Sequence, residues 1–155
     1  MTDLIQFTVH GDPKPQPRLR AFAMKTIGNT FTARVYDPHT AEGWKSAIAD
    51  AARPHCPPEP WRGPVKVRLA FTFKRPKIHY RQGKHADLLR DDVPDWHTKK
   101  PDADNLAKAV LDAMTMLGFW KDDSQVTWLI VQKQYGLRGD VHVAIWDLAR
   151  QPVTA

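Results

Sequence analysis

The order of apolar patterns along the chain predicts an α+β protein, a single domain in which a mixed β-sheet packs with two main helices. The length supports one domain, because 155 residues can bury a hydrophobic core but leave little room for a second one. The periodicities read strand, two strands, helix, strand, long loop, helix, strand, strand, and such a mixture is typical of α+β folds. We therefore treat residues 1–155 as one domain.

The N-terminal part of the chain predicts three strands. Residues 4–10 alternate apolar and polar side chains, which is the pattern of a strand with one buried face. Prolines at every second position from 13 to 17 then force an extended path. Arg18–Lys25 and Phe31–Tyr36 follow, and the short segment between them contains Gly28, so the two segments predict a hairpin.

The middle of the chain predicts a helix and then the clearest strand. Asp37–Thr40 resembles a helix start, and Ala41–Ala52 places Trp44 and Ile48 on one apolar face. Val65–Phe73 alternates apolar with polar or small residues, so we expect a strand there with one buried face.

The C-terminal part predicts the second main helix and two more strands. Apolar residues recur from Leu106–Leu117 at helical spacing and form one stripe, and Gly118 stands where a helix commonly ends. Val126–Ile130 and Val141–Ile145 alternate as strands on either side of a turn, and we expect them to pair as an antiparallel hairpin.

Composition excludes several classes of protein. Hydrophobic residues make up 42% and charged residues 26%, the balance of a soluble globular protein. The single cysteine, Cys56, excludes an internal disulfide framework and a cysteine-rich zinc site. No apolar stretch approaches the roughly 20 residues of a membrane span, and the chain start resembles no signal peptide. We therefore expect a cytoplasmic protein that does not enter membranes.

The positive charge is concentrated in two segments. The net charge is +6, which favours a polyanionic partner such as nucleic acid. Residues 74–100 hold eight Lys and Arg against four Asp, and residues 11–25 hold four against one. The alternative is a solvated charged loop. The candidate phosphate contacts are Lys74, Arg75, Lys77, Arg81, Lys84, Lys99 and Lys100. Trp96 in the same connection could stack on an unpaired base or simply pack.

The sharpest chemical feature is the run from Lys99 to Lys108, KKPDADNLAK, at the predicted start of the second helix. Asp102 and Asp104 lie two positions apart, where the helix dipole favours ionised carboxylates. Two fixed carboxylates suit Mg²⁺, which keeps its other positions for water and phosphate. Lys108, one turn after Asp104, would share that face and could reach a phosphate oxygen. The alternative is that an aspartate merely caps the helix.

A third acid could come from Asp122 or Asp123, just after the second helix. An acid there reaches the first pair only if the chain folds back toward it. The alternative is that both residues belong to a surface turn.

Residues 99–126 closely resemble the RusA family of Holliday junction resolvases. The resemblance lies in DADNLAK from Asp102, then Asp112 and Ala113, and then GFWKDDSQV from Gly118 to Val126. Residue type, order and spacing all agree with the family pattern of D-x-D-N-L-x-K followed by G-(F/I/V)-W-x-D-D-x-Q-V.

The resemblance implies a small homodimer, of a kind common in bacteria and their prophages, that uses Mg²⁺ to cut four-way DNA junctions; Mn²⁺ could substitute. It places the catalytic, metal-holding acids at Asp102, Asp104 and Asp123 and the essential lysine at Lys108, with Asp122 a weaker candidate. A two-fold homodimer with one site per subunit suits paired, symmetric cuts in a junction. The alternatives are a nuclease for flaps or forks, and a DNA-binding module without catalysis.

Overall fold

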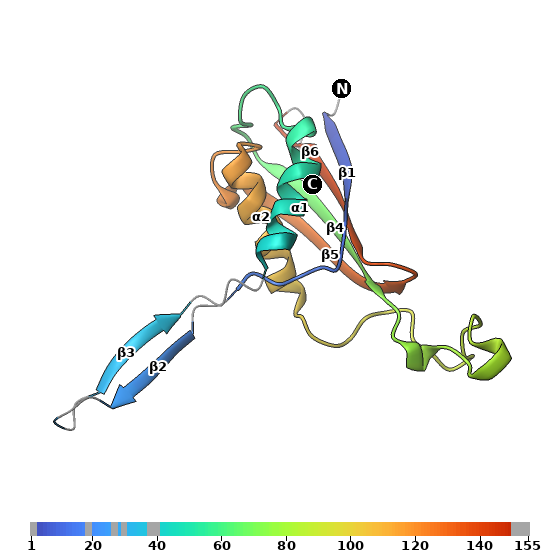
Figure 1. The fold of residues 1–155 in the computed structure, drawn as a ribbon. Helices are drawn as coiled ribbons and strands as arrows, with labels where there is room; N and C mark the ends of the chain where they lie inside the picture. Colours follow the sequence, from blue (N-terminus) through green and yellow to red (C-terminus); the bar gives the residue numbers. More distant parts are fainter. Residues whose placement is uncertain (1–2, 18–19, 26–27, 29–30, 37–40, 150–155) are drawn as a thin grey trace.

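The computed structural model describes residues 3–17, 20–25, 28, 31–36 and 41–149. It confirms the α+β class, with one mixed sheet and two main helices (Figure 1). Arg18 and the helix start predicted at Asp37–Thr40 lie outside the described residues. The elements are β1 (Leu4–His10), β2 (Arg20–Lys25), β3 (Phe31–Tyr36), α1 (Glu42–Ala52), η1 (Arg53–His55), β4 (Val65–Lys74), η2 (Lys77–His79), η3 (Gly83–His85), α2 (Ala103–Leu117), η4 (Asp123–Gln125), β5 (Val126–Gly136) and β6 (Asp140–Asp147).

The main sheet has the strand order β1-β6-β4-β5, in which β5 runs parallel to β4 and the other pairs are antiparallel. The predicted hairpin of β5 with β6 is therefore wrong, because β4 lies between these two strands. The predicted hairpin of β2 with β3 is confirmed, and it forms a separate two-stranded sheet.

The central position of β4 agrees with the burial of its apolar face. Its inward-facing side chains, from Val65 to Phe71, are fully buried beneath the helix layer. The turn from β5 to β6 crosses the end of β4, where the N–H of Arg75 donates to the carbonyl of Gly136. Two alternating segments joined by a short turn predict a hairpin, but here the two strands, β5 and β6, each pair with β4 and not with each other.

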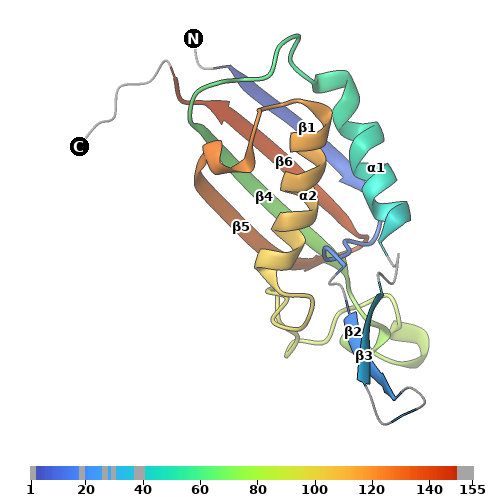
Figure 2. The same ribbon diagram turned by 90° about the vertical axis from the view of Figure 1, so that its left-hand side faces the viewer.

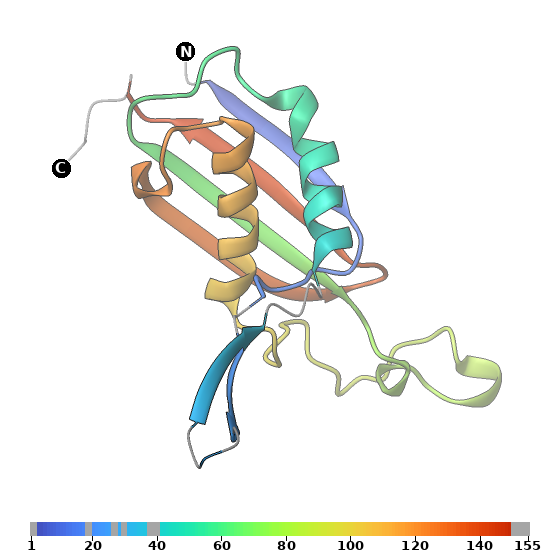
Figure 3. The same cartoon turned by 60° about the vertical axis from the view of Figure 1, so that its left-hand side comes forward.

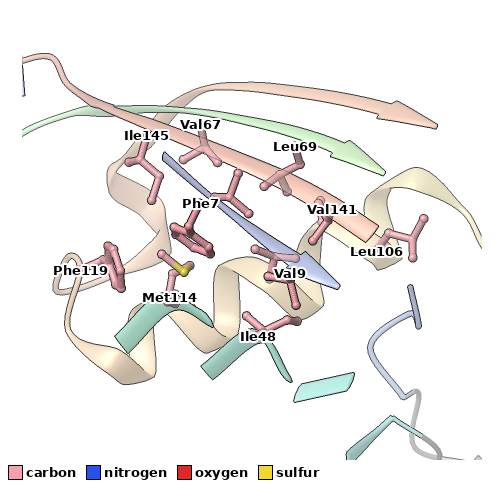
Figure 4. Close-up of a cluster of buried hydrophobic side chains, with 14 of the residues drawn as sticks. Phe7, Val9, Ile48, Val67, Leu69, Leu106, Met114, Phe119, Val141 and Ile145 are labelled. Atoms are coloured by element: carbon pink, nitrogen blue, oxygen red, sulfur yellow. The ribbon is translucent and has the colours of Figure 1, made fainter. Parts of the chain in front are cut away.

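Both helices cover the same face of the main sheet, as Figures 2 and 3 show. The core lies between the two layers, and Figure 4 shows Ile48 of α1 and Met114 of α2 directed toward Val9 and other strand residues. The predicted stripe of α2 faces the core, fully buried at Leu106, Ala109, Val110 and Met114 and partly buried at Ala113 and Leu117. Gly118 ends the helix with φ 86°, a left-handed conformation that favours glycine. None of the described helices is long and apolar enough to cross a membrane.

Two projections leave the body near the end of the sheet where α2 begins. One is the β2–β3 hairpin, and the other is the chain between β4 and α2, here called the arm (residues 75–101) (Figures 1 and 3). The arm folds back on itself through a bridge between Tyr80 and Leu89 and returns along β5, where Trp96 pairs with Gln134. The basic segment of the sequence therefore emerges beside the start of α2.

Gly139, in the turn that crosses β4, provides a test of this topology. A Cβ at Gly139 would lie 2.7 Å from the carbonyl oxygen of Gly11, a backbone atom that cannot easily move. We expect Gly139→Ala to lower the free energy of unfolding by about 1–3 kcal/mol, measured by urea denaturation. Gly43→Ala is the matched control, because nothing lies within 4 Å of its Cβ position, and a loss of stability there equal to that of Gly139→Ala would contradict the explanation.

Candidate functional site

Asp102 and Asp104 lie at the start of α2, the first at the N-cap position and the second in the first turn. Both residues are exposed. The Asp102 side chain makes no capping hydrogen bond, although its backbone is extended as in an N-cap residue. Helix capping therefore does not account for the Asp102 carboxylate. Both carboxylates sit where the helix dipole favours negative charge.

Lys108 follows Asp104 by one turn of α2, as its spacing predicts. Its ammonium lies 3.2 Å from Oδ1 of Asp112, and more than half of the lysine side chain is exposed, at 56%. An exposed ion pair of this kind contributes little to stability. The Lys108 ammonium can therefore exchange Asp112 for a phosphate oxygen at small cost.

Asp122 and Asp123 have different surroundings. The Asp122 carboxylate accepts a 2.8 Å hydrogen bond from the N–H of Ser124, and the Gln125 side chain accepts one from the N–H of Asp122. The Ser124 hydrogen bonds hold the pKa of Asp122 below its usual value. The structure thus gives Asp122 a capping role. Asp123 is exposed and lines a groove between α1 and α2 together with Asp112 and Asp122.

The length of α2 separates the first two acids from Asp123. The helix has 15 residues, and at 1.5 Å per residue it is about 22 Å long. Asp102 and Asp104 lie at its start, whereas Asp123 lies beyond its end. Figure 2 shows α2 running along the sheet between these two regions. In the described part of the chain, no group of three or more His, Cys, Asp or Glu side chains is placed to hold a metal ion. One chain alone therefore does not bring the three acids together.

A cleft of about 1020 Å³, here called the basic cleft, opens where β4 ends and α2 begins. Asp102 and Asn105 line it from the helix, and Asp12 is the other acid on its walls. The cationic side chains that line it are Lys14, Lys74, Arg75, Lys77, Lys99 and Lys100. Six cations against two acids make the cleft strongly positive beside Asp102.

The predicted phosphate contacts thus divide into two groups. Lys74, Arg75, Lys77, Lys99 and Lys100 line the basic cleft, whereas Arg81 and Lys84 lie further out on the arm. The Arg75 side chain is only 9% exposed, and it donates to the carbonyl of Pro94 and to Asp95, so it also fastens the returning arm.

The outer part of the arm carries its own ion pairs. Arg81 pairs with Asp91 at 3.1 Å, and Arg90 pairs with Asp92 at 2.8 Å. The hydrogen bond from Arg90 lowers the pKa of Asp92. Because these pairs are exposed, phosphates could compete for the arginines.

Lys133, on β5, is a residue that the sequence reasoning missed. Its ammonium donates to the carbonyl oxygens of Lys99 and Pro101, at 2.7 and 2.6 Å. These carbonyls belong to the segment that leads directly into Asp102. Lys133 therefore fixes the point at which the first acid enters α2. The sequence contained one signal for this role. Lys133 follows Leu129 and Val131 at two-residue spacing, so it lies on the same, apolar face of the strand.

Comparison with known proteins gives a consistent result. Residues 10–146 match the family described as "Endodeoxyribonuclease RusA". The "Uncharacterized protein YqaN" of Bacillus subtilis (strain 168) is 34% identical over 154 residues, which cover 95% of this chain and 99% of that protein. The "Crossover junction endodeoxyribonuclease rusA" of Lactococcus phage r1t is 38% identical over 53 residues, 34% of this chain and 40% of the phage protein.

Proposed function

The chain belongs to the RusA family of endodeoxyribonucleases, and from that premise we propose that it resolves four-way DNA junctions as a homodimer, by paired, symmetric nicks that depend on Mg²⁺. Membership makes it an endodeoxyribonuclease of the Holliday junction resolving type. The observation that carries the finer proposal is the placement of Asp102 on the wall of the basic cleft, with Asp104 two residues further along α2. Cations that suit a phosphate backbone thus lie beside the Asp102 carboxylate, which suits a metal.

The residues at the start of α2 fit a hard divalent cation by their chemistry. Asp102 and Asp104 provide exposed carboxylate oxygens, the donors that Mg²⁺ prefers, and Mn²⁺ accepts the same donors. A cation held there would polarise the scissile phosphate and lower the pKa of a bound water.

The chain's own residues supply binding and charge. The lysines of the basic cleft would hold the phosphates on either side of the bond to be cut, without reading sequence. Lys108 would leave Asp112 and place its ammonium against a phosphate oxygen, where it stabilises the negative charge of the transition state. Lys133 would keep Asp102 in position through the Lys99 and Pro101 carbonyls.

Asp123 enters this site from a second copy of the chain. It lies about a helix length away from Asp102 in its own chain, so it can join the first two acids only across a dimer. In a two-fold dimer with antiparallel α2 helices, the start of one α2 lies beside the end of the other. The surface for such contact is the groove between α1 and α2, where Ala113 and Met116 are accessible. Met116 is 88% exposed in the single chain.

A cleavage assay tests the proposed function. Protein is incubated with a synthetic mobile four-way junction, a flap, a fork and a linear duplex, each with Mg²⁺ and with EDTA. Symmetric paired nicks in the junction alone, only with Mg²⁺, are the expected result. Preferred cutting of flaps or forks would contradict the junction as the substrate and identify a nuclease for other branched DNA. Junction binding without any cutting would indicate a non-catalytic DNA-binding module.

Substitution of Lys133 tests its positioning role. Lys133→Met keeps the apolar stem and removes the two hydrogen bonds to the segment before Asp102. We expect Mn²⁺ affinity, measured by electron paramagnetic resonance, and the cutting rate to fall roughly ten- to a hundredfold, as for other partners of metal ligands. Lys133→Arg should restore part of both.

Lys66→Met is the matched control for Lys133→Met. Lys66 is also a lysine of the main sheet, but its ammonium lies over the rings of Trp128 and Trp146. A similar loss of Mn²⁺ affinity in both variants, or none in Lys133→Met, would contradict the positioning role.

A further inference from the structure

The basic cleft has an aromatic floor. The ring of His97 stacks on Phe73, with centroids 4.0 Å apart and planes 20° apart, and Tyr135 lies against His97 at 4.9 Å. All three residues line the cleft. Burial of the ring, and after it the charge of Lys133, lower the pKa of His97 below its usual value near 6.5. A lowered pKa favours the neutral ring at pH 7. The three rings, here called the floor, are half-buried, whereas the lysines that line the cleft, here called the rim, are exposed.

Flat uncharged rings next to lysines are the combination with which proteins bind single-stranded nucleic acid. Bases stack on the rings, and the cations follow the phosphates. The volume of about 1020 Å³ is at the upper end of the size range of sites that enclose small molecules.

We propose that the basic cleft binds an unpaired nucleotide of the strand to be cut, with its base against the floor of Phe73, His97 and Tyr135 and its phosphates against the lysines of the rim. This inference rests on the proposed function and adds that the strand to be cut is unpaired where it binds the cleft. A base inside a duplex has both faces covered by its neighbours, whereas a branch point can release one. The cleft thus selects branched DNA by the availability of an unpaired base.

Trp96 is the other aromatic residue of the arm on which the unpaired base could stack. It precedes His97, its side chain is 57% exposed, and it is not one of the residues that line the cleft. Stacking on Trp96 would place the base outside the basic cleft.

Photocrosslinking of the wild-type protein distinguishes the two positions. A four-way junction with 5-iododeoxyuridine at the branch point is bound in EDTA and irradiated, and the crosslinked peptide is sequenced. The expected crosslinks are to Phe73, His97 or Tyr135, and the same label inside a linear duplex should give none of them. Crosslinks to Trp96, or to no residue of the floor, would overturn the proposal.

Two leucine variants measure how much the floor contributes to the affinity for single-stranded DNA. We expect His97→Leu to weaken binding of a short thymidine oligonucleotide roughly five- to a hundredfold by fluorescence anisotropy, the range for losing one stacked base. Trp96→Leu is the matched control and should change this affinity less than about twofold. Thermal melts establish that both variants are folded, and equal losses in both would contradict the proposal.

The outcome is separable from that of the proposed function, because none of these measurements needs cutting. A protein that cuts junctions but gives no crosslink to the floor refutes the nucleotide site alone. A protein that gives the crosslink but cuts no DNA with Mg²⁺ refutes the nuclease function alone.

Discussion

Asp104→Asn is expected to slow junction cutting by roughly a thousandfold while junction binding stays equal or becomes tighter. Asparagine keeps the size of the side chain at the start of α2 but removes the charge that would hold a cation. The same change removes a negative charge beside the phosphates, so DNA affinity should not fall. Single-turnover cutting rates with Mg²⁺ and anisotropy titrations in EDTA measure the two effects separately.

Asp87→Asn is the matched control for Asp104→Asn. Asp87 is an exposed aspartate on the arm, whereas Asp104 lies in the first turn of α2. We expect it to cut at nearly the wild-type rate. A folded Asp104→Asn variant that cuts normally, or that no longer binds the junction, would contradict the assigned role.

Mixing two inactive variants is expected to restore cutting. If Asp123 of one chain completes the site of its partner, a mixed dimer of Asp102→Asn and Asp123→Asn chains has one site that lacks both acids and one that is intact. Equal mixing makes about half of the dimers mixed, so roughly a quarter of the sites should be active. Because each mixed dimer cuts one strand, singly nicked junctions should accumulate. Gel analysis of the mixed sample measures both effects.

The control for this experiment is a mixture of Asp102→Asn with Asp104→Asn. These two acids lie at the start of the same helix, so every site of a mixed dimer lacks one of them and no activity should return. Differently tagged chains that purify together establish that the subunits have exchanged. Exchange without recovery of cutting in the Asp102→Asn and Asp123→Asn mixture would refute the shared site.

The elements of the fold were predictable because their patterns are local. The alternation in Val65–Phe73 and the stripe from Leu106 to Leu117 each lie within one segment, and a strand and a helix form at these positions. The choice of strand partners is not local. Nothing within β5 or β6 specifies that β4 passes between them, since that depends on which strand buries the most apolar surface.

The candidate site shows the same division. Asp102, Asp104 and Lys108 stand within one helical start, so their spacing alone suggests a common role. Lys133 reaches the site only through the parallel register that places it opposite Phe71 in the sheet. The relation of Asp123 to the first pair depends on the length of α2 and on a second subunit, and neither a motif nor a spacing contains that information.

The position of β6 has a consequence for synthesis on the ribosome. β6 pairs with both β1 and β4, and Leu4 meets Trp146 from almost the other end of the polypeptide. While the chain is growing, β1 and one edge of β4 have no strand to pair with until β6 emerges. Contacts between such distant segments are slow to form, and the exposed edges can meanwhile pair with other molecules. We therefore expect nascent chains that stop before Asp140 to be retained by chaperones or degraded.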